Sequence, residues 1–207
     1  MKRLALFFSM ALIFDANAQQ STYAPSNMAN AEVPVQVLTD DSTYWTITTL
    51  SNVAYRNTTP GAYQNTYKSG GGMIVKFRFM EGGFYEFMLY VQANTYGIEN
   101  ETWTHVEGTV EFGKDSKGKP IFHTHARKGV YRINKNGQVS SRAIPETELK
   151  DQHSNTYLWD KWDNPDDPLR DYLLMIDLDA HPKVDLDNPS TIDPAWISKF
   201  HIDKRGK

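Results

Sequence analysis

Apolar and polar residues alternate between residues 73 and 92, interrupted once by Glu81-Gly82-Gly83. The positions before this break that share the apolar face are Met73, Val75, Phe77 and Phe79. The opposite face carries Lys76 and Arg78. Glycines at the break can adopt the positive φ that a chain reversal needs. Because successive side chains of a strand point to opposite faces, the pattern predicts a β-hairpin with one buried, aromatic-rich face.

Similar strand patterns continue along the rest of the chain. They cover residues 44–56, 102–112, 121–126, 129–133, 138–144, 155–162 and 171–178. The glycine-rich stretch 57–72 is predicted to be a long loop at the rim of the sheet. A helix is expected only at 194–200, with Asp193 as N-cap and Pro194 at the first helical position.

About eight to ten strands without alternating helices predict an all-β fold built on an antiparallel sheet. Closing such a sheet into a barrel removes its unpaired edges. A barrel of about eight strands is just wide enough for side chains or for one small ligand. We therefore expect a single antiparallel meander closed into a barrel of about eight strands, with a short C-terminal helix. A two-sheet β-sandwich is the alternative.

The N-terminus has the three regions of a secretory signal peptide, namely Lys2-Arg3, an apolar run from Leu4 to Phe14, and Ala16-Asn17-Ala18. A membrane span needs roughly 20 apolar residues, so this shorter run predicts no transmembrane anchor. We expect a signal peptide over 1–18, a flexible leader over 19–31 and a single domain over 32–207. The exported protein would be soluble, either in the periplasm or outside the cell.

Composition narrows the range of partners. The chain has no cysteine, which excludes disulfides and a lipid-bearing cysteine after the signal peptide. Its formal net charge is −3, and its basic residues do not form a cluster. Binding to nucleic acid needs a clustered basic face, so we expect no nucleic-acid partner.

Short motifs follow one another in a recognisable order, beginning with Tyr44-Trp45 on the first long strand. The others are Gly70-Gly71-Gly72, Phe77-x-Phe79, Gly82 with Phe84-Tyr85, Tyr96-Gly97, Gly108-Thr109-Val110, Gly129-Val130-Tyr131 and Tyr157-x-Trp159. Over roughly residues 42–180, this order resembles secreted bacterial lipocalin-like (calycin-type) β-barrel proteins. The resemblance implies a barrel closed around a cavity. Most such proteins have no assigned activity, and no functional residue is carried over.

Aromatic residues are numerous, with 5 Trp, 11 Tyr and 10 Phe. Their amphipathic rings suit a cavity for an apolar ligand or a platform for sugar rings. The alternative is that the rings only fill the barrel, since they pack well on a pleated surface. The candidate ligand-binding residues are Trp45, Tyr55, Phe77, Phe87, Trp103, Tyr131 and Trp159.

Two groups of polar residues could hold a metal. His123 and His125 share one face of a strand, and His105 and Glu107 share a face of the preceding one, which are ligand types that zinc accepts. A half-exposed strand explains the same alternation, so we expect neither a metal site nor a cofactor. A second group has part of the spacing of a calcium loop but lacks its glycine and final glutamate. It comprises Asp177, Asp179, Asp185 and Asp187.

Catalytic chemistry has little support in the sequence, and no catalytic residue is assigned. There is no cysteine nucleophile and no Gly-x-Ser-x-Gly elbow. Carboxylate pairs such as Glu86 and Glu107 could flank a glycosidic bond, but β-proteins offer such pairs by chance. An enzyme is therefore the less favoured interpretation.

We expect an exported barrel that binds a small apolar or amphipathic molecule without catalysis. The alternative is a secreted β-sandwich module that binds carbohydrate or another protein. A closed cavity inside the sheet would favour the first function, and an exposed row of Trp and Tyr would favour the second.

Overall fold

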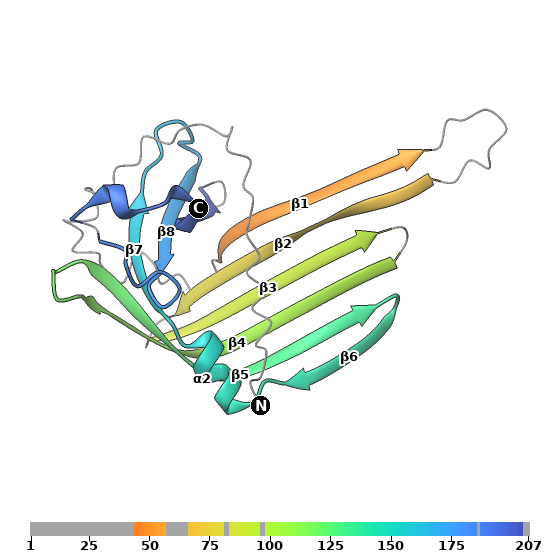
Figure 1. Ribbon diagram of the computed structural model, residues 1–207, viewed down its shortest axis with the longest axis horizontal. Helices are drawn as coiled ribbons and strands as arrows, with labels where there is room; N and C mark the ends of the chain where they lie inside the picture. Colours follow the sequence, from red (N-terminus) through yellow and green to blue (C-terminus); the bar gives the residue numbers. More distant parts are fainter. Residues whose placement is uncertain (1–43, 57–65, 81–82, 96–97, 186, 205–207) are drawn as a thin grey trace.

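The computed structural model describes residues 44–56, 66–80, 83–95, 98–185 and 187–204 (Figure 1). The signal peptide and leader predicted for 1–31 lie outside these residues. The strands are β1 (Trp45–Arg56), β2 (Thr66–Met80), β3 (Phe84–Thr95), β4 (Ile98–Lys114), β5 (Pro120–Lys135), β6 (Gln138–Ala143), β7 (Thr156–Trp162), β8 (Arg170–Asp177) and β9 (Ser198–Asp203). The helices are α2 (Glu146–His153) and two 3-10 helices, η2 (Pro189–Thr191) and η3 (Pro194–Trp196).

All of the described strands belong to one antiparallel sheet. Their order is β4-β3-β2-β1-β9-β8-β7-β5-β6, and β4 also pairs with β5. This additional pairing closes eight strands into a ring and leaves β6 beside β5 as an edge strand. The predicted all-β fold, an antiparallel meander closed by about eight strands, is therefore confirmed, and the described strands do not form a two-sheet sandwich.

The ring closes over only one end of its long strands. β1 meets β9 at a single register pair, Thr46 with His201. β5 pairs with β7 only over Ile121–His123. Beyond these short contacts, β1 to β6 continue as an open sheet that extends away from the ring (Figure 1). One group of strands therefore supplies both a closed section and an open section.

A β-bulge lies where β4 and β5 run from the closed section into the open one. The register shifts between Glu107 and Gly108, so that Arg127 is the extra residue on β5. A side chain at Gly108 would collide with the carbonyl oxygen of His125. A bulge bends a strand and increases its twist. The segments 121–126 and 129–133, predicted as separate strands, are thus two halves of one bent strand.

The main core fills the inside of the ring. Its buried residues are Trp45, Phe77, Phe79, Tyr85, Val106, Val110, Phe122, Ile144, Leu149, Trp159, Leu173, Met175 and Phe200. The inward face predicted for Phe77 and Phe79 is confirmed, and Val106 and Val110 of β4 are buried with them. A second cluster, on the other face of β7 and β8, covers this part of the ring with the C-terminal segment. It comprises Ile121, Leu158, Leu174, Ile176 and Ile192.

One turn prediction and one loop prediction can be compared with the backbone. Gly83 has φ 77°, and the β5–β6 turn has Asn136 at φ 51° and Gly137 at φ 85°, as a tight hairpin requires. The loop predicted over 57–72 is wrong in its second part, because β2 begins at Thr66. Residues 57–65 lie outside the described part of the chain. At Gly71 an added Cβ would lie 2.6 Å from the carbonyl oxygen of Gln92, so the lack of a side chain here allows β2 and β3 to lie close together.

The predicted C-terminal helix is much shorter than expected. Asp193 does cap η3, since its side chain accepts a hydrogen bond of 2.8 Å from the backbone N–H of Ala195. The chain then leaves the helix and forms β9. Phe200 is buried opposite Leu173, so pairing with β8 and burial override the local helical preference.

The helix α2 was not expected from the sequence. It packs against β5, and its buried Leu149 joins the main core. Pro145 stands at its N-cap without a side-chain cap bond, whereas Glu146 and Glu148 in the first turn and Lys150 and His153 in the last suit the helix dipole. In the described part of the chain, no helix is long and apolar enough to cross a membrane.

Candidate functional site

Five of the seven aromatic residues proposed from the sequence lie in or against the core of the ring. Trp45, Phe77 and Trp159 are exposed by only 2%, 4% and 3%. Phe87 and Tyr131 are partly buried and pack against the same core. Side chains therefore occupy the interior of the ring where these residues meet. Much of the aromatic surplus packs within the protein itself.

The other two residues lie outside that core. Trp103 is on the outer face of the open sheet, where its ring centroid is 5.1 Å from that of Tyr90 on the neighbouring strand. The Tyr90 hydroxyl donates a hydrogen bond of 2.8 Å to Oε1 of Glu101. Burial, reinforced by Glu101, raises the pKa of Tyr90 to about 12, so this hydroxyl stays protonated at neutral pH. Tyr55 lies in β1, but its side chain is outside the described part of the structure.

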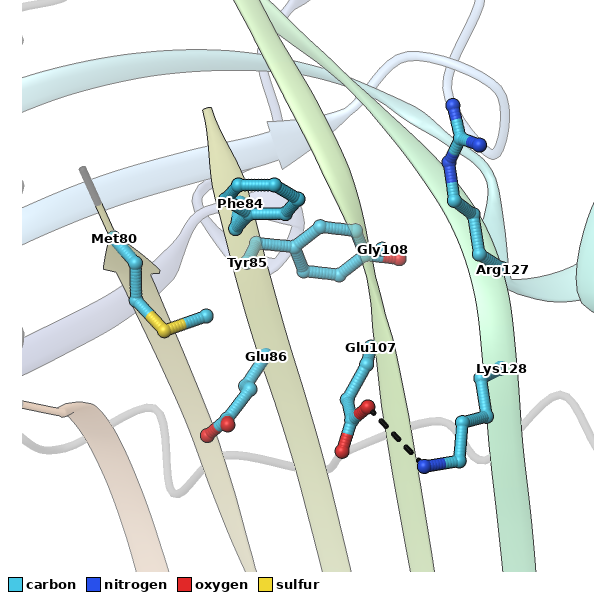
Figure 2. Close-up of a pocket in the computed structure, with 8 residues that line it drawn as sticks. All are labelled: Met80, Phe84, Tyr85, Glu86, Glu107, Gly108, Arg127 and Lys128. Carbon is cyan, nitrogen blue, oxygen red and sulfur yellow. Dashed lines mark ion pairs between the residues drawn. The ribbon is translucent and has the colours of Figure 1, made fainter. Parts of the chain in front are cut away.

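A pocket of about 360 Å³ lies beside the bulge, across β2 to β5 (Figure 2). Its lining residues are Met80, Phe84, Tyr85, Glu86, Glu107, Gly108, Arg127 and Lys128. Phe84 is 53% exposed, so it presents an apolar surface to solvent at the pocket. The pocket therefore combines an apolar wall with charged groups of both signs.

The two carboxylates of the pocket come from neighbouring strands, because Glu86 pairs directly with Glu107. Nη2 of Arg78 lies 2.8 Å from Oε1 of Glu86, and the Tyr44 hydroxyl donates a hydrogen bond of 2.7 Å to Oε2. Burial alone would raise the pKa of Glu86, but the hydrogen bonds from Tyr44 and Arg78 and the nearby positive charge outweigh it and lower this pKa. Glu86 is thus a fixed carboxylate that is ionised at neutral pH.

The two cations of the pocket differ in their partners. Nζ of Lys128 lies 3.6 Å from Oε2 of Glu107, and Figure 2 shows this ion pair. The Arg127 side chain points away from Glu107 (Figure 2). Within the described ranges, Arg127 forms no ion pair. Its guanidinium is therefore the cation of the pocket that remains available to an anionic ligand.

His105 adds an imidazole to the same carboxylate pair. Its Nε2 lies 3.9 Å from Oε1 of Glu107. One ligand atom each from Glu86, His105 and Glu107 lie within 4.8 Å of one another. The sequence interpretation did not place Glu86 in this group, because it did not fix the β3–β4 register. Only Tyr96 and Gly97 separate the paired residues Thr95 and Ile98, and this short connection was the available clue.

The histidine set considered from the sequence is not brought together. His105 pairs with Val130 on β5, whereas His123 pairs with Glu111 at the other end of β4. Nδ1 of His123 lies 2.9 Å from the Thr156 hydroxyl, and Nε2 of His125 lies 3.7 Å from Oε1 of Glu111. His105 therefore belongs to a different cluster from His123 and His125.

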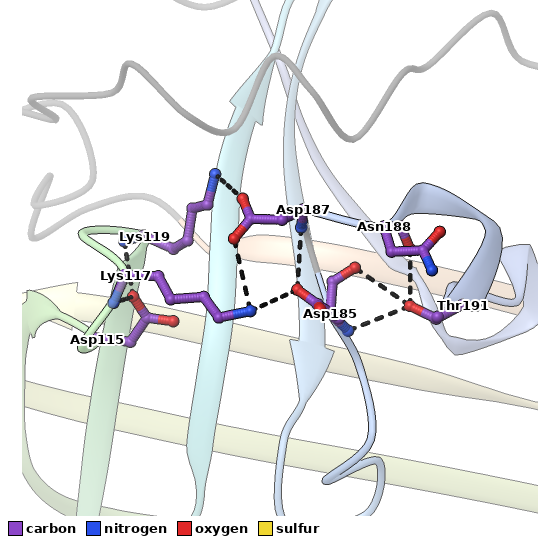
Figure 3. A network of polar contacts seen from close by, with 7 residues as sticks. All are labelled: Asp115, Lys117, Lys119, Asp185, Asp187, Asn188 and Thr191. Carbon is purple, nitrogen blue, oxygen red and sulfur yellow. Dashed lines mark hydrogen bonds and ion pairs between the residues drawn. The ribbon is translucent and has the colours of Figure 1, made fainter.

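The aspartates of the possible calcium loop are engaged by other groups. Oδ1 of Asp177 accepts hydrogen bonds from the backbone N–H groups of Asp179 and Ala180. Nζ of Lys117 lies 2.7 Å from Asp185 and 3.4 Å from Asp187 (Figure 3). Lys119 also approaches Asp187, at 3.1 Å. These contacts make the segment an ion-paired surface network.

His153, at the end of α2, lies on the inner side of the sheet. Its Nε2 is 2.9 Å from the Tyr131 hydroxyl, and its ring lies beside that of Phe87 at 6.5 Å. Burial lowers the pKa of His153, and the charge of Glu148 opposes this effect only partly. His153 is thus a neutral, partly buried group that links α2 to β5.

Comparisons of the chain with protein-family models, curated proteins and solved structures gave no match.

Proposed function

We propose that the protein binds a small amphipathic molecule with an acidic end, without catalysis, in the pocket beside the β4–β5 bulge. The observation that carries the proposal is the combination, around one pocket of about 360 Å³, of exposed Phe84 and of Arg127, which has no ion-pair partner among the described residues. This volume falls within the lower range of small-molecule sites, which span roughly 300–1,000 Å³.

Each end of such a ligand has a suitable partner. Met80 and Phe84 offer apolar surface for a hydrocarbon or aromatic group. The guanidinium of Arg127 can bind a carboxylate through two parallel hydrogen bonds. Glu86 and Glu107 flank the site and disfavour a second negative charge on the ligand. A monoanionic amphiphile is therefore the best match.

The state of Glu86 supports binding over hydrolysis. A glycosidase would need one carboxyl that remains protonated to act as general acid. Both oxygens of Glu86 already accept hydrogen bonds, and its pKa is lowered. Glu86 is therefore not suited to be that general acid.

The proposal includes export. It is supported by the charged, apolar and small-residue regions within 1–18. A mature protein beginning at Gln19 would support this part of the proposal, and intact mass measurement of the secreted or periplasmic protein tests it. Retention of residues 1–18 would contradict it.

Titration with cis-parinaric acid, a fluorescent fatty acid, tests the ligand class. We expect saturable binding, displaced by an unlabelled fatty acid and weakened at least about fivefold by Arg127→Gln, which removes a charge-assisted bond. The matched control is Arg132→Gln, which removes the same charge from β5 beside Trp103 instead of the pocket. Equal weakening by both variants would indicate general attraction of anions and contradict the pocket.

A second variant separates the apolar wall from the charge. Phe84→Ala removes exposed apolar surface, so we expect weaker binding of the fatty acid but unchanged binding of acetate. Unchanged fatty-acid binding in this variant would place the ligand elsewhere.

Carbohydrate binding is a second candidate, favoured by the Tyr90–Trp103 pair on the outer face. The rings come from adjacent strands, and Glu101 beside them accepts hydrogen bonds of 2.8 Å from both Tyr90 and Asn134. Aromatic rings flanked by polar groups suit sugar recognition. Glycan-array binding that is lost in Trp103→Ala but kept in Arg127→Gln would favour this function over the first.

A further inference from the structure

We propose that Glu86, His105 and Glu107 bind one divalent transition-metal ion, with Zn²⁺ as the expected occupant. This departs from the expectation of no metal, which weighed His105 and Glu107 together with His123 and His125 and did not include Glu86. The cluster adjoins the pocket through its two carboxylates, but the inference does not rest on the organic ligand, because metal binding can be measured alone.

Strand register supplies the geometry. Glu86 on β3 lies opposite Glu107 on β4, and His105 follows two residues away on the same face of β4. The three ligand atoms are within 4.8 Å of one another. In a tetrahedral zinc site the ligands are about 3.4 Å apart, because each bond is about 2.1 Å long. Small side-chain rotations from positions already on rigid strands would complete the site.

Residues around Glu86 hold it in place without blocking it. Tyr44 and Arg78 each donate a hydrogen bond to a different oxygen of Glu86. A carboxylate oxygen has two lone pairs, so an electron pair remains for a metal on either oxygen. Hydrogen bonds of this kind orient ligating carboxylates in metal sites. Tyr44 and Arg78 would therefore position a metal ligand.

Lys128 competes with a metal for Glu107. Its Nζ is 3.6 Å from Oε2 of Glu107, and its side chain is 73% exposed. An exposed lysine can rotate into solvent when an ion takes its place, since such surface pairs contribute little. Removal of the Lys128 charge should therefore strengthen metal binding, whereas loss of a ligand should weaken it.

The ligand types select zinc and leave a position open. One imidazole nitrogen and two carboxylate oxygens are a set that Zn²⁺ accepts, at about 2.0–2.2 Å from each donor. Three protein ligands leave the fourth tetrahedral position for water, as in open zinc sites. This position would face the solvent-accessible side of the sheet, because His105 and Glu107 are each 42% exposed.

Isothermal titration of chelator-treated full-length protein with ZnCl₂ tests the inference. We expect one equivalent for the wild type, affinity at least about tenfold lower for His105→Gln and Glu107→Gln, and higher affinity for Lys128→Gln. The matched control is His125→Gln, because His125 also faces a glutamate, Glu111, at 3.7 Å but without a third ligand. This control should bind zinc like the wild type.

Absence of zinc binding to the wild type would overturn the inference, and so would equal loss in His105→Gln and His125→Gln. Thermal unfolding in EDTA shows whether each variant is folded. If Glu107→Gln does not fold, Co²⁺ absorbance decides the matter with His105→Gln alone, since a visible band must be present in the wild type and absent from that variant. Arg127→Gln should keep zinc binding, which separates failure of the metal site from failure of the pocket.

Discussion

The inside of the ring and the outer face of β3 and β4 come from the same strands but have opposite properties. Tyr85 and Val106 point inward and are fully buried in a core of aromatic and aliphatic side chains. The alternate residues Glu86 and Glu107 point outward beside a pocket, with Arg78 and Lys128 as ion-pair partners. Within one period-two pattern, inward residues form the core and outward residues line the charged pocket.

This difference changes where a ligand is expected in such a ring. The ring is closed by short pairings, one of them a single register pair, and large aromatic side chains meet inside it. Close packing of this kind leaves little space for another molecule. The bulge at Glu107 and Gly108 instead places a pocket on the outside, at the site where the sheet bends.

Truncation of an aromatic side chain that points into the core should lower the stability most. Phe79 is 0% exposed and contacts Phe112 and Phe122, so Phe79→Ala should lower the free energy of unfolding by about 3–5 kcal/mol. The outward control Phe84→Ala should lower it by less than about 1 kcal/mol. Urea unfolding measures both. Similar losses in the two variants would contradict the assignment of the faces.

Adding a methyl group at the bulge should cause the next largest loss of stability. In Gly108→Ala the new Cβ collides with the backbone carbonyl of His125 and approaches the Tyr85 ring at 2.8 Å, so we expect a loss of about 1–3 kcal/mol. Gly113, on the same strand, has open space around it, and Gly113→Ala should be neutral or stabilising by up to about 1 kcal/mol. Equal stability of the two variants would argue against a tightly packed bend.

The link between α2 and the inner face of β5 should make stability depend on pH. Burial lowers the pKa of His153 below the value of about 6.5 for an exposed histidine, so the unfolded chain takes up a proton first as the pH falls. The stability gained from neutral His153 is complete above about pH 6.5 and is lost as the pH falls through its folded pKa. Unfolding of wild type and His153→Gln between pH 8 and 5 should show a weaker decline in the variant. A parallel decline would mean that other groups, such as His201, account for the pH dependence.

Local patterns in the sequence predicted much of the ring but not its long-range register. The alternation around Phe77 and the glycines after Glu81 were sufficient for the β2–β3 hairpin, because neighbouring residues determine both. Arg127 was not recognised as a bulge residue, since a bulge depends on how two strands pair. Gly71 was included in a predicted loop because glycines are common in loops, although it lies in β2 and allows the neighbouring strand to lie close.

The candidate site was harder to predict for the same reason. The alternation showed which face of its strand each of Glu86 and Glu107 occupies. Their direct pairing, however, could be known only from the β3–β4 register. The aromatic residues proposed as ligands, such as Trp45 and Trp159, are chemically equally suited to a core and to a cavity. Only packing distinguishes these two uses, and packing is a property of the whole ring.

Loss of the surface ion pairs around Lys117 should change the stability least. Lys117 contacts Asp185 and Asp187 in solvent, where side-chain entropy and screening offset the attraction. Lys117→Gln should lower the Tm slightly at low salt, and the difference should vanish in about 1 M NaCl, where the Debye length is about 3 Å. Lys114→Gln is the control, because Lys114 forms no ion pair among the described residues, and its Tm should match the wild type at both salt concentrations. The Tm of the chelator-treated wild type should also be equal with and without added CaCl₂. An increase with calcium that disappears in Asp185→Asn would instead make this network a calcium site and add a second site outside the ring.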